Sequence, residues 1–211
     1  METEEIREKK EPKRLPVWAC ILLFALGLFV CMGLYGTIGF GLLSLILGDE
    51  ARHPGLLVYT VTEASMLLSV LTPAVILLYF ERRPFSDLGL TLKGHVRGLW
   101  YGLLVAMLLY LIGFGLSLAI GEVEVTGFQF DPLNLLGTFV FCLLVALTEE
   151  IMMRGYILGR LLHTRMNKFL ALFVSALLFA LLHIFNPNVA FLPMLNLVLA
   201  GMLIGASYLY T

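Results

Sequence analysis

An otherwise uncharged apolar run ends in the polar stretch Leu147-Thr148-Glu149-Glu150-Ile151-Met152-Met153-Arg154-Gly155. The preceding residues, 133–148, carry no charge, and as a helix they would extend about 24 Å at 1.5 Å per residue. A carboxylate inside a lipid bilayer is costly, so it is read first as a functional group. The stretch therefore predicts a membrane-spanning helix with a polar site built into it.

The composition also indicates a membrane protein. Of the 211 residues, 60% are hydrophobic and 14% are charged, and the mean hydropathy is +0.94; soluble domains contain about 25% charged residues. The net charge of -1 gives no indication of nucleic-acid binding. Cys20, Cys31 and Cys142 lack CxxC spacing, which indicates neither a disulfide framework nor a thiolate metal site. We expect all three to be buried as small apolar side chains.

Six apolar segments are candidate spans, since a helical crossing takes about 20 apolar residues. They cover residues 17–48, 56–80, 98–120, 133–163, 169–185 and 189–211. The first contains Gly27, Gly33, Gly36, Gly39 and Gly41 and fits either one tilted helix or a helix plus a re-entrant piece. We therefore predict an all-α, polytopic transmembrane helical bundle. Its parts are expected to be an N-terminal tail (1–16), N-terminal membrane spans (17–84) and a site-bearing membrane domain (85–211).

Lys and Arg residues are distributed unequally between the loops on the two predicted sides of the membrane. An excess of these residues in short loops marks the cytoplasmic face. They concentrate in the tail, the 81–97 loop and the 154–168 connection, whereas the other loops hold Arg52 and mainly acidic residues. We expect both termini and these two connections to be cytoplasmic. No cleavable signal peptide is expected, because the tail mixes five acids with five bases and the apolar run behind it far exceeds a signal core of about 7–15 residues.

A histidine on the next segment is predicted to lie at the depth of the carboxylates. Good helix formers continue to residue 162, and the first turn-like cluster is 163–167. In an antiparallel hairpin that turns near residue 166, positions 149 and 183 are each 17 residues from the turn. We therefore predict that Glu149 and His183 lie level and face each other.

The two carboxylates are expected to differ in role. Glu150 and Arg154 are spaced i,i+4 in the favourable acid-before-base order, and pairing lowers the cost of burying a charge. Glu149 points about 100° away around the helix and lacks such a neighbour, so it suits a general base. Three other readings remain open. The charge pair locks helix packing, Glu149 and His183 form a proton relay in a transporter, or His183 is a core histidine whose ring is satisfied by a backbone carbonyl.

Glu63 and the remaining histidines are not expected to be catalytic. Glu63, about two turns below the predicted outer surface, is read as an interfacial residue. His53, His95 and His163 occur in predicted loops and are assigned no role. A proton-coupled transporter would place further charges through both leaflets, and the outer halves of the third to fifth segments carry none, which ranks that reading third.

Two motifs on consecutive segments carry a family resemblance. Glu149-Glu150-Ile151-Met152-Met153-Arg154 fits EExxxR, and Phe179-Ala180-Leu181-Leu182-His183 fits FxxxH. Together they resemble the CPBP family of intramembrane proteases, which includes type 2 CAAX prenyl endopeptidases and bacteriocin-processing (Abi) proteins. Asn186-Pro187 and, more weakly, Leu88-Gly89-Leu90 are also similar. The resemblance covers about residues 85–211; each motif alone is weak, whereas the pair at this spacing is specific.

The resemblance implies a glutamate-dependent endopeptidase that cleaves peptides or prenylated protein C-termini near the cytoplasmic face. The implied catalytic residues are Glu149, His183 and Glu150, with Glu149 activating a water molecule. The implied positioning residues are Arg154, Phe179 and Asn186. No HExxH zinc motif occurs, and no metal or other cofactor is expected.

One feature departs from the family pattern. That pattern continues with a further helix carrying a second histidine and, four residues later, an asparagine or aspartate. No histidine follows His183 in this sequence, and we expect the chain to be C-terminally incomplete. The alternative from another functional class is a non-catalytic membrane immunity or scaffold protein on the same fold.

Overall fold

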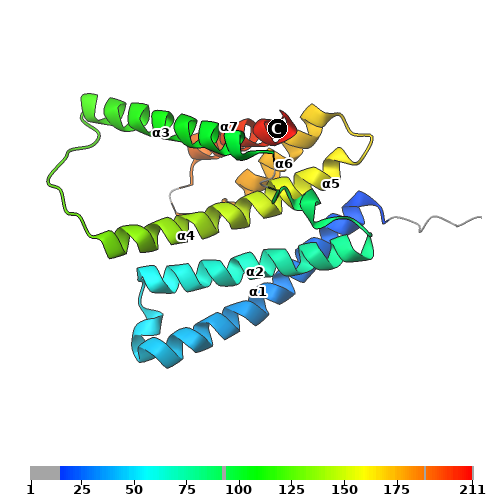
Figure 1. Cartoon of the computed structure of the whole chain (residues 1–211), viewed down its shortest axis with the longest axis horizontal. Helices are drawn as coiled ribbons and strands as arrows, with labels where there is room; N and C mark the ends of the chain where they lie inside the picture. The colour runs from blue at the N-terminus through cyan, green and yellow to red at the C-terminus, as the bar shows by residue number, and fades with distance from the viewer. Residues whose placement is uncertain (1–14, 92–93, 188, 211) are drawn as a thin grey trace, which may run out of the picture.

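The long apolar runs fold into long helices, and a computed structural model describes them over residues 15–91, 94–187 and 189–210 (Figure 1). In chain order the elements are α1 (Val17–Leu47), the 3₁₀ turn η1 (Gly48–Arg52), α2 (Leu56–Phe80), the 3₁₀ turn η2 (Phe85–Leu88), α3 (Val96–Ala119), α4 (Pro132–Glu150), the π-helix η3 (Ile151–Leu158), α5 (Gly159–Leu162), α6 (Lys168–Leu182) and α7 (Phe191–Tyr210). The predicted all-α fold is confirmed in these described ranges.

Five of the helical stretches are long and apolar enough to cross a membrane, and the chain is a multi-pass membrane protein. The first predicted segment is one continuous helix of 31 residues rather than a helix plus a re-entrant piece. α4, η3 and α5 run on as a single helical rod over Pro132–Leu162, also of 31 residues. Each rod extends about 46 Å at 1.5 Å per residue, more than the bilayer core of about 30 Å, so tilting is expected.

The fifth predicted segment is shorter than expected. α6 has 15 residues and ends at Leu182, where the prediction extended the helix to residue 185. The backbone turns at His183, and Pro187 follows within a few residues; a proline disfavours helical backbone in the residue before it. At about 22 Å, α6 is shorter than the thickness of the bilayer core.

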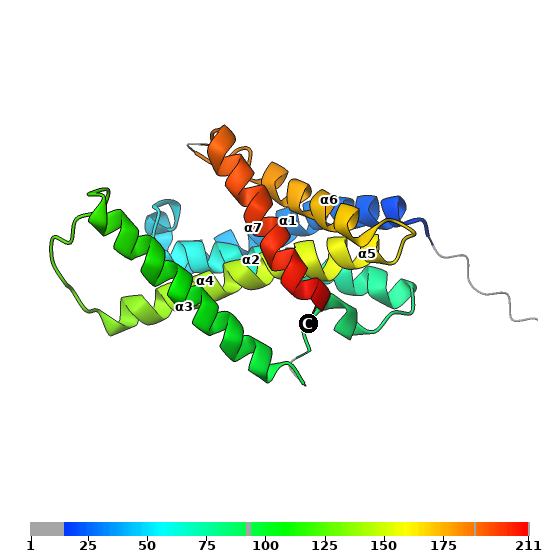
Figure 2. The same cartoon turned by 90° about the horizontal axis from the view of Figure 1, so that it is seen from above.

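The helices pack in an order that differs from the chain order. α1 lies against α2, α2 against α4, and α6 against α7 (Figures 1 and 2). α6 and α7 approach closely at Gly201, where an added Cβ would come within 3.1 Å of the Ala176 backbone. α3 lies at the edge of the bundle and contains no buried residue (Figure 2).

The core is centred on η3. All eight residues of Ile151–Leu158 are buried, whereas α4 contains one buried residue, Thr148. Side chains from α1, α2, η2, α6 and α7 complete this cluster. The expectation of three buried cysteines holds only for Cys20: Cys31 is half-buried and Cys142 is exposed, because the outer part of α4 is not covered by other helices.

The ends of the bundle keep the predicted partition of loops. The start of α1, the connection after α2 and the 163–167 turn lie at one end, and η1 and the 120–131 connection lie at the other (Figure 1). The assignment of the first end to the cytoplasm stays a prediction, as does the domain boundary at residue 84. The tail residues 1–14 lie outside the described ranges.

Candidate active site

The predicted polar stretch lies where α4 passes into η3. π-helical turns, with their i→i+5 hydrogen bonds, occur frequently at functional sites. Two contacts support the wider turn. Ser175 of α6 donates a hydrogen bond from Oγ to the Met153 carbonyl oxygen over 3.2 Å, and the backbone of η2 lies against Gly155, where a Cβ would meet the Leu88 carbonyl oxygen at 2.5 Å. Only glycine allows this approach.

Glu149 and His183 lie together, as the hairpin geometry predicted. Glu149 Oε1 and His183 Nε2 are 3.6 Å apart, with 34% and 22% of the two side chains exposed. His183 caps the C-terminus of α6, and its Nδ1 is 2.8 Å from the Phe179 carbonyl oxygen. Because a carbonyl oxygen only accepts, Nδ1 carries a hydrogen, and in the neutral form of the ring the Nε2 lone pair would face Glu149.

Glu150 and Arg154 form the predicted i,i+4 ion pair, with 3.0 Å between Glu150 Oε1 and Arg154 Nη1. The two partners differ sharply in environment, since 43% of the Glu150 side chain is exposed against 3% of Arg154. The Arg154 guanidinium also stacks over the Phe179 ring at 4.9 Å. Its Nη2 is buried and makes no hydrogen bond to any described residue.

Phe179 links the two pairs. Its ring lies 4.7 Å from the His183 ring, measured between centroids, and beneath the Arg154 guanidinium. The aromatic ring thus packs on the cation of one pair and the imidazole of the other. Five of the six predicted site residues are brought into this one cluster.

Asn186, the sixth, lies beside the cluster. It follows α6 in an exposed turn, and its backbone N–H donates to the His183 carbonyl oxygen over 3.0 Å. Among the described contacts its side chain does not reach Glu149 or Arg154, and its positioning role stays a prediction. Glu63 is half-buried in α2, and its interfacial reading also stays a prediction.

A second buried ion pair was not anticipated from the sequence. Arg160 Nη1 pairs with Glu81 Oε2, with 7% and 12% of the side chains exposed. Cys20 Sγ donates to Glu81 Oε1 over 2.8 Å, and the Arg160 guanidinium lies 5.1 Å from the Tyr156 ring centre. Glu81 had been assigned to a polar loop and Arg160 to a cytoplasmic connection. One sequence feature could have indicated that Arg160 is buried: it follows Tyr156 at i,i+4 spacing within an apolar stretch.

The donor set at the site does not match a catalytic zinc centre. Such a centre takes three protein ligands, and here Glu149 and His183 offer two, because Arg154 engages Glu150. Among the described residues no group of three or more His, Cys, Asp and Glu side chains is arranged to hold a metal ion.

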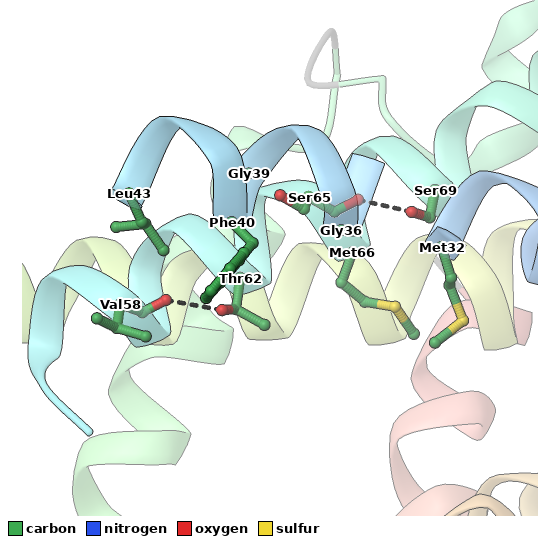
Figure 3. A pocket seen from close by; sticks show the side chains of 10 residues that line it. All are labelled: Met32, Gly36, Gly39, Phe40, Leu43, Val58, Thr62, Ser65, Met66 and Ser69. Atoms are coloured by element: carbon green, nitrogen blue, oxygen red, sulfur yellow. Dashed lines mark hydrogen bonds between the residues drawn. The ribbon is translucent and has the colours of Figure 1, made fainter. Parts of the chain in front are cut away.

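A cavity of about 160 Å³ between α1 and α2 is separate from this cluster (Figure 3). None of the site residues lines it. The hydroxyl groups of Thr62 and Ser69 donate to backbone carbonyl oxygens one turn earlier, over 2.8 and 2.7 Å (Figure 3). Since the remaining lining is mainly apolar, we assign no catalytic role to this cavity.

Comparison with known proteins points to one family. Residues 131–211 match the family described as type II CAAX prenyl endopeptidase Rce1-like. No curated protein and no solved structure matches the chain. The matched range starts at the Asp131 cap of α4 and includes both motifs, whereas residues 85–130 lie outside it. The part of the chain that carries the Glu149–His183 pair is thus similar to the Rce1-like family of type II CAAX prenyl endopeptidases.

Proposed function

We propose that this protein is an intramembrane endopeptidase in which Glu149 is the general base and His183 its partner. The carrying observation is the 3.6 Å separation between Glu149 Oε1 and His183 Nε2. When the ring is neutral, with Nδ1–H directed at the Phe179 carbonyl, both facing atoms are acceptors. Two facing acceptors require a donor between or beside them, and water has two hydrogens to give.

The reaction follows from that arrangement. A water molecule about 2.8 Å from each acceptor donates one hydrogen to each and directs an oxygen lone pair outward, towards a substrate carbonyl carbon. Glu149 takes a proton as the oxygen–carbon bond forms and the carbonyl electrons move to its oxygen. The C–N bond then breaks, and the proton on Glu149 passes to the leaving amine.

Glu150 and Arg154 hold the site in shape and offer a contact for substrate. Arg154 is fixed by Glu150 and by the Phe179 ring, and its Nη2 is a buried donor without a partner among the described residues. A buried donor of this kind is suited to bind a substrate carboxylate or carbonyl oxygen by a charge-assisted hydrogen bond.

The family name supports a prenylated protein C-terminus as substrate. A prenyl chain is apolar and would lie in the lipid beside the exposed outer part of α4 while the peptide enters the polar cluster. Cleavage close to the cytoplasmic face follows from the distribution of Lys and Arg among the loops. The alternative substrate is a peptide such as a bacteriocin leader, which the same two residues would hydrolyse by the same mechanism.

The test is peptide cleavage by the purified full chain in liposomes. The substrate is a farnesylated CAAX peptide with a fluorophore and a quencher on either side of the scissile bond, with the same unprenylated peptide as a second arm. We expect Glu149→Gln and His183→Gln to lower kcat/KM at least about 100-fold, the effect of losing general acid–base catalysis. The matched control Glu122→Gln, in the loop before α4, should retain activity.

Wild-type turnover in Glu149→Gln would overturn this mechanism. Cleavage of the unprenylated peptide at the same rate would retain the mechanism and redirect the substrate class. The non-catalytic alternative predicts a different result, because the Glu149–His183 contact would then be purely structural. In that case the wild-type protein would cleave neither peptide, and Glu149→Gln would lower the thermal stability of the protein.

A further inference from the structure

A cavity of about 240 Å³ lies at the end of the bundle where η2, η3, α5 and α7 meet. Its polar lining consists of Arg83, Ser86, Asp87, Arg160, His163 and Tyr208, together with Tyr156, whose hydroxyl donates to the Cys20 carbonyl oxygen over 3.4 Å. Neither Glu149 nor His183 lines it, so the cavity is distinct from the candidate active site. Two guanidinium groups and one carboxylate line the cavity, and Glu81 pairs with Arg160 from outside the lining.

The Arg160 side chain is held in the wall of this cavity, but not all of its nitrogen donors have a hydrogen-bond partner among the described residues. Only 7% of its side chain is exposed, and one nitrogen, Nη1, pairs with Glu81. The other terminal nitrogen, Nη2, is buried without a hydrogen-bond partner among the described residues. Glu81 does not line the cavity, so the charge of Arg160 is balanced from outside it while a donor is left over.

Arg83 places a second guanidinium in the cavity wall, next to the His163 ring. His163 Nδ1 is 2.6 Å from the Gly159 carbonyl oxygen, which fixes the ring hydrogen on that nitrogen. Arg83 Nη1 lies 3.3 Å from the same Nδ1. Because the Nδ1 hydrogen is directed at the Gly159 carbonyl oxygen, Nδ1 cannot also accept a hydrogen bond from Arg83 Nη1, so this Arg83 donor is left to Asp87 or to a bound ligand. Asp87, 3.3 Å from Arg83 Nη1, satisfies only part of that guanidinium.

The donors approach from different elements. Arg83 precedes η2, Arg160 belongs to α5, and Tyr208 belongs to α7, where its hydroxyl lies close enough to Gly159 to touch an added Cβ at 3.7 Å. Donors that converge from several directions suit a tetrahedral oxyanion better than a planar carboxylate. Arginine forks are well matched to phosphate oxygens.

We propose that this cavity binds a phosphate group, supplied either by free phosphate or by a lipid headgroup. The site lies at the end of the bundle that carries the arginine-rich connections, the level at which lipid phosphates occur. It is independent of the proposed peptidase activity, because none of the residues that line it belongs to the Glu149–His183 cluster.

The experiment measures the thermal midpoint of the full chain in maltoside micelles at constant ionic strength. One arm is titrated with inorganic phosphate against chloride, and the other with phosphatidic acid against phosphatidylcholine. We expect wild type to be stabilised in a saturable manner in at least one arm. Arg83→Gln should raise the half-maximal concentration about tenfold, which corresponds to losing one charge-assisted hydrogen bond.

Arg82→Gln is the matched control, since Arg82 is the exposed neighbour and is outside the cavity lining. It removes the same charge and should leave the half-maximal concentration unchanged. Arg160→Lys, which keeps the charge and removes the free Nη2, should weaken binding without loss of the folded protein. Stabilisation by inorganic phosphate supports a soluble ligand, and stabilisation by phosphatidic acid alone supports a headgroup. No saturable stabilisation in either arm, or equal weakening by Arg83→Gln and Arg82→Gln, would overturn the proposal.

Discussion

The two parts of the Pro132–Leu162 rod have similar apolar sequences and opposite surroundings. In α4, one residue of 19 is buried, whereas in η3 all eight are buried. Lipid tails are as apolar as leucine, so an apolar helix gains little free energy by exchanging lipid for a neighbouring helix. The difference shows that packing contacts, and not hydropathy, separate the lipid-facing part of this rod from the part that supports the site.

The site lies at the junction of these two parts. Glu149 and Glu150 end the exposed part and keep access to substrate and water, while Arg154 lies in the buried part. A rigid wall beneath partly exposed catalytic groups is the arrangement that holds reacting atoms in place. The following predictions test whether the contrast between α4 and η3 is energetic as well as geometric.

The largest effect is expected from Gly155→Ala in the buried part. Its Cβ would lie 2.5 Å from the Leu88 carbonyl oxygen, and a backbone atom cannot move aside cheaply. We expect a loss of about 3 kcal/mol in unfolding free energy, at the upper end of the range for overpacking. The measurement is denaturation in mixed detergent micelles, followed by helical circular dichroism.

Gly137→Ala, in the lipid-facing part of the same rod, is the control. There the Cβ would meet the Leu56 Cδ2 at 2.7 Å, and this atom is the tip of a flexible side chain. We expect a change close to zero. Equal losses at both glycines would show that the approach of η2 to η3 contributes nothing specific.

Met153→Ala should have the second-largest effect. Met153 is fully buried, and the substitution leaves a cavity in the core. We expect a loss of about 2 kcal/mol, near the lower end for buried large-to-small changes, because the transfer term is small between lipid and protein interior.

The matched change in α4 is Leu136→Ala, at a position with 60% exposure. Lipid fills the space left by the removed atoms, and the same denaturation assay should detect almost no change. A loss at Leu136 as large as that at Met153 would refute the division of the rod into a lipid-facing and a packed part.

The smallest effect is expected from Ser175→Ala. The change removes the buried hydrogen bond from Oγ to the Met153 carbonyl oxygen, which ties α6 to η3. We expect a loss of about 1 kcal/mol, the typical net contribution of one hydrogen bond. Ser44→Ala is the control, because Ser44 donates to Phe40 within its own helix. If both substitutions lower the unfolding free energy equally, the hydrogen bond between α6 and η3 stabilises the fold no more than a bond within one helix.

The comparison extends to the two buried arginines. Arg154 and Arg160 each pair with a carboxylate, stack on an aromatic ring and keep one unpartnered nitrogen in the described structure. The first pairs within one helical turn, so its spacing was visible in the sequence. The second pairs with Glu81, 79 positions earlier in the chain, and no local pattern announces such a contact.

The sequence by itself determined the helical spans, the continuation of the fourth helix past the carboxylates and the meeting of Glu149 with His183. These follow from local quantities: apolar length, the rise per residue and the position of a turn. Tertiary structure alone decided which part of the rod is packed, where the helix widens into η3, and how Arg160 pairs with Glu81 beside the cavity at η2. Those features depend on contacts between segments far apart in the chain, and in a lipid environment apolar composition does not distinguish a helix face that touches protein from one that touches lipid.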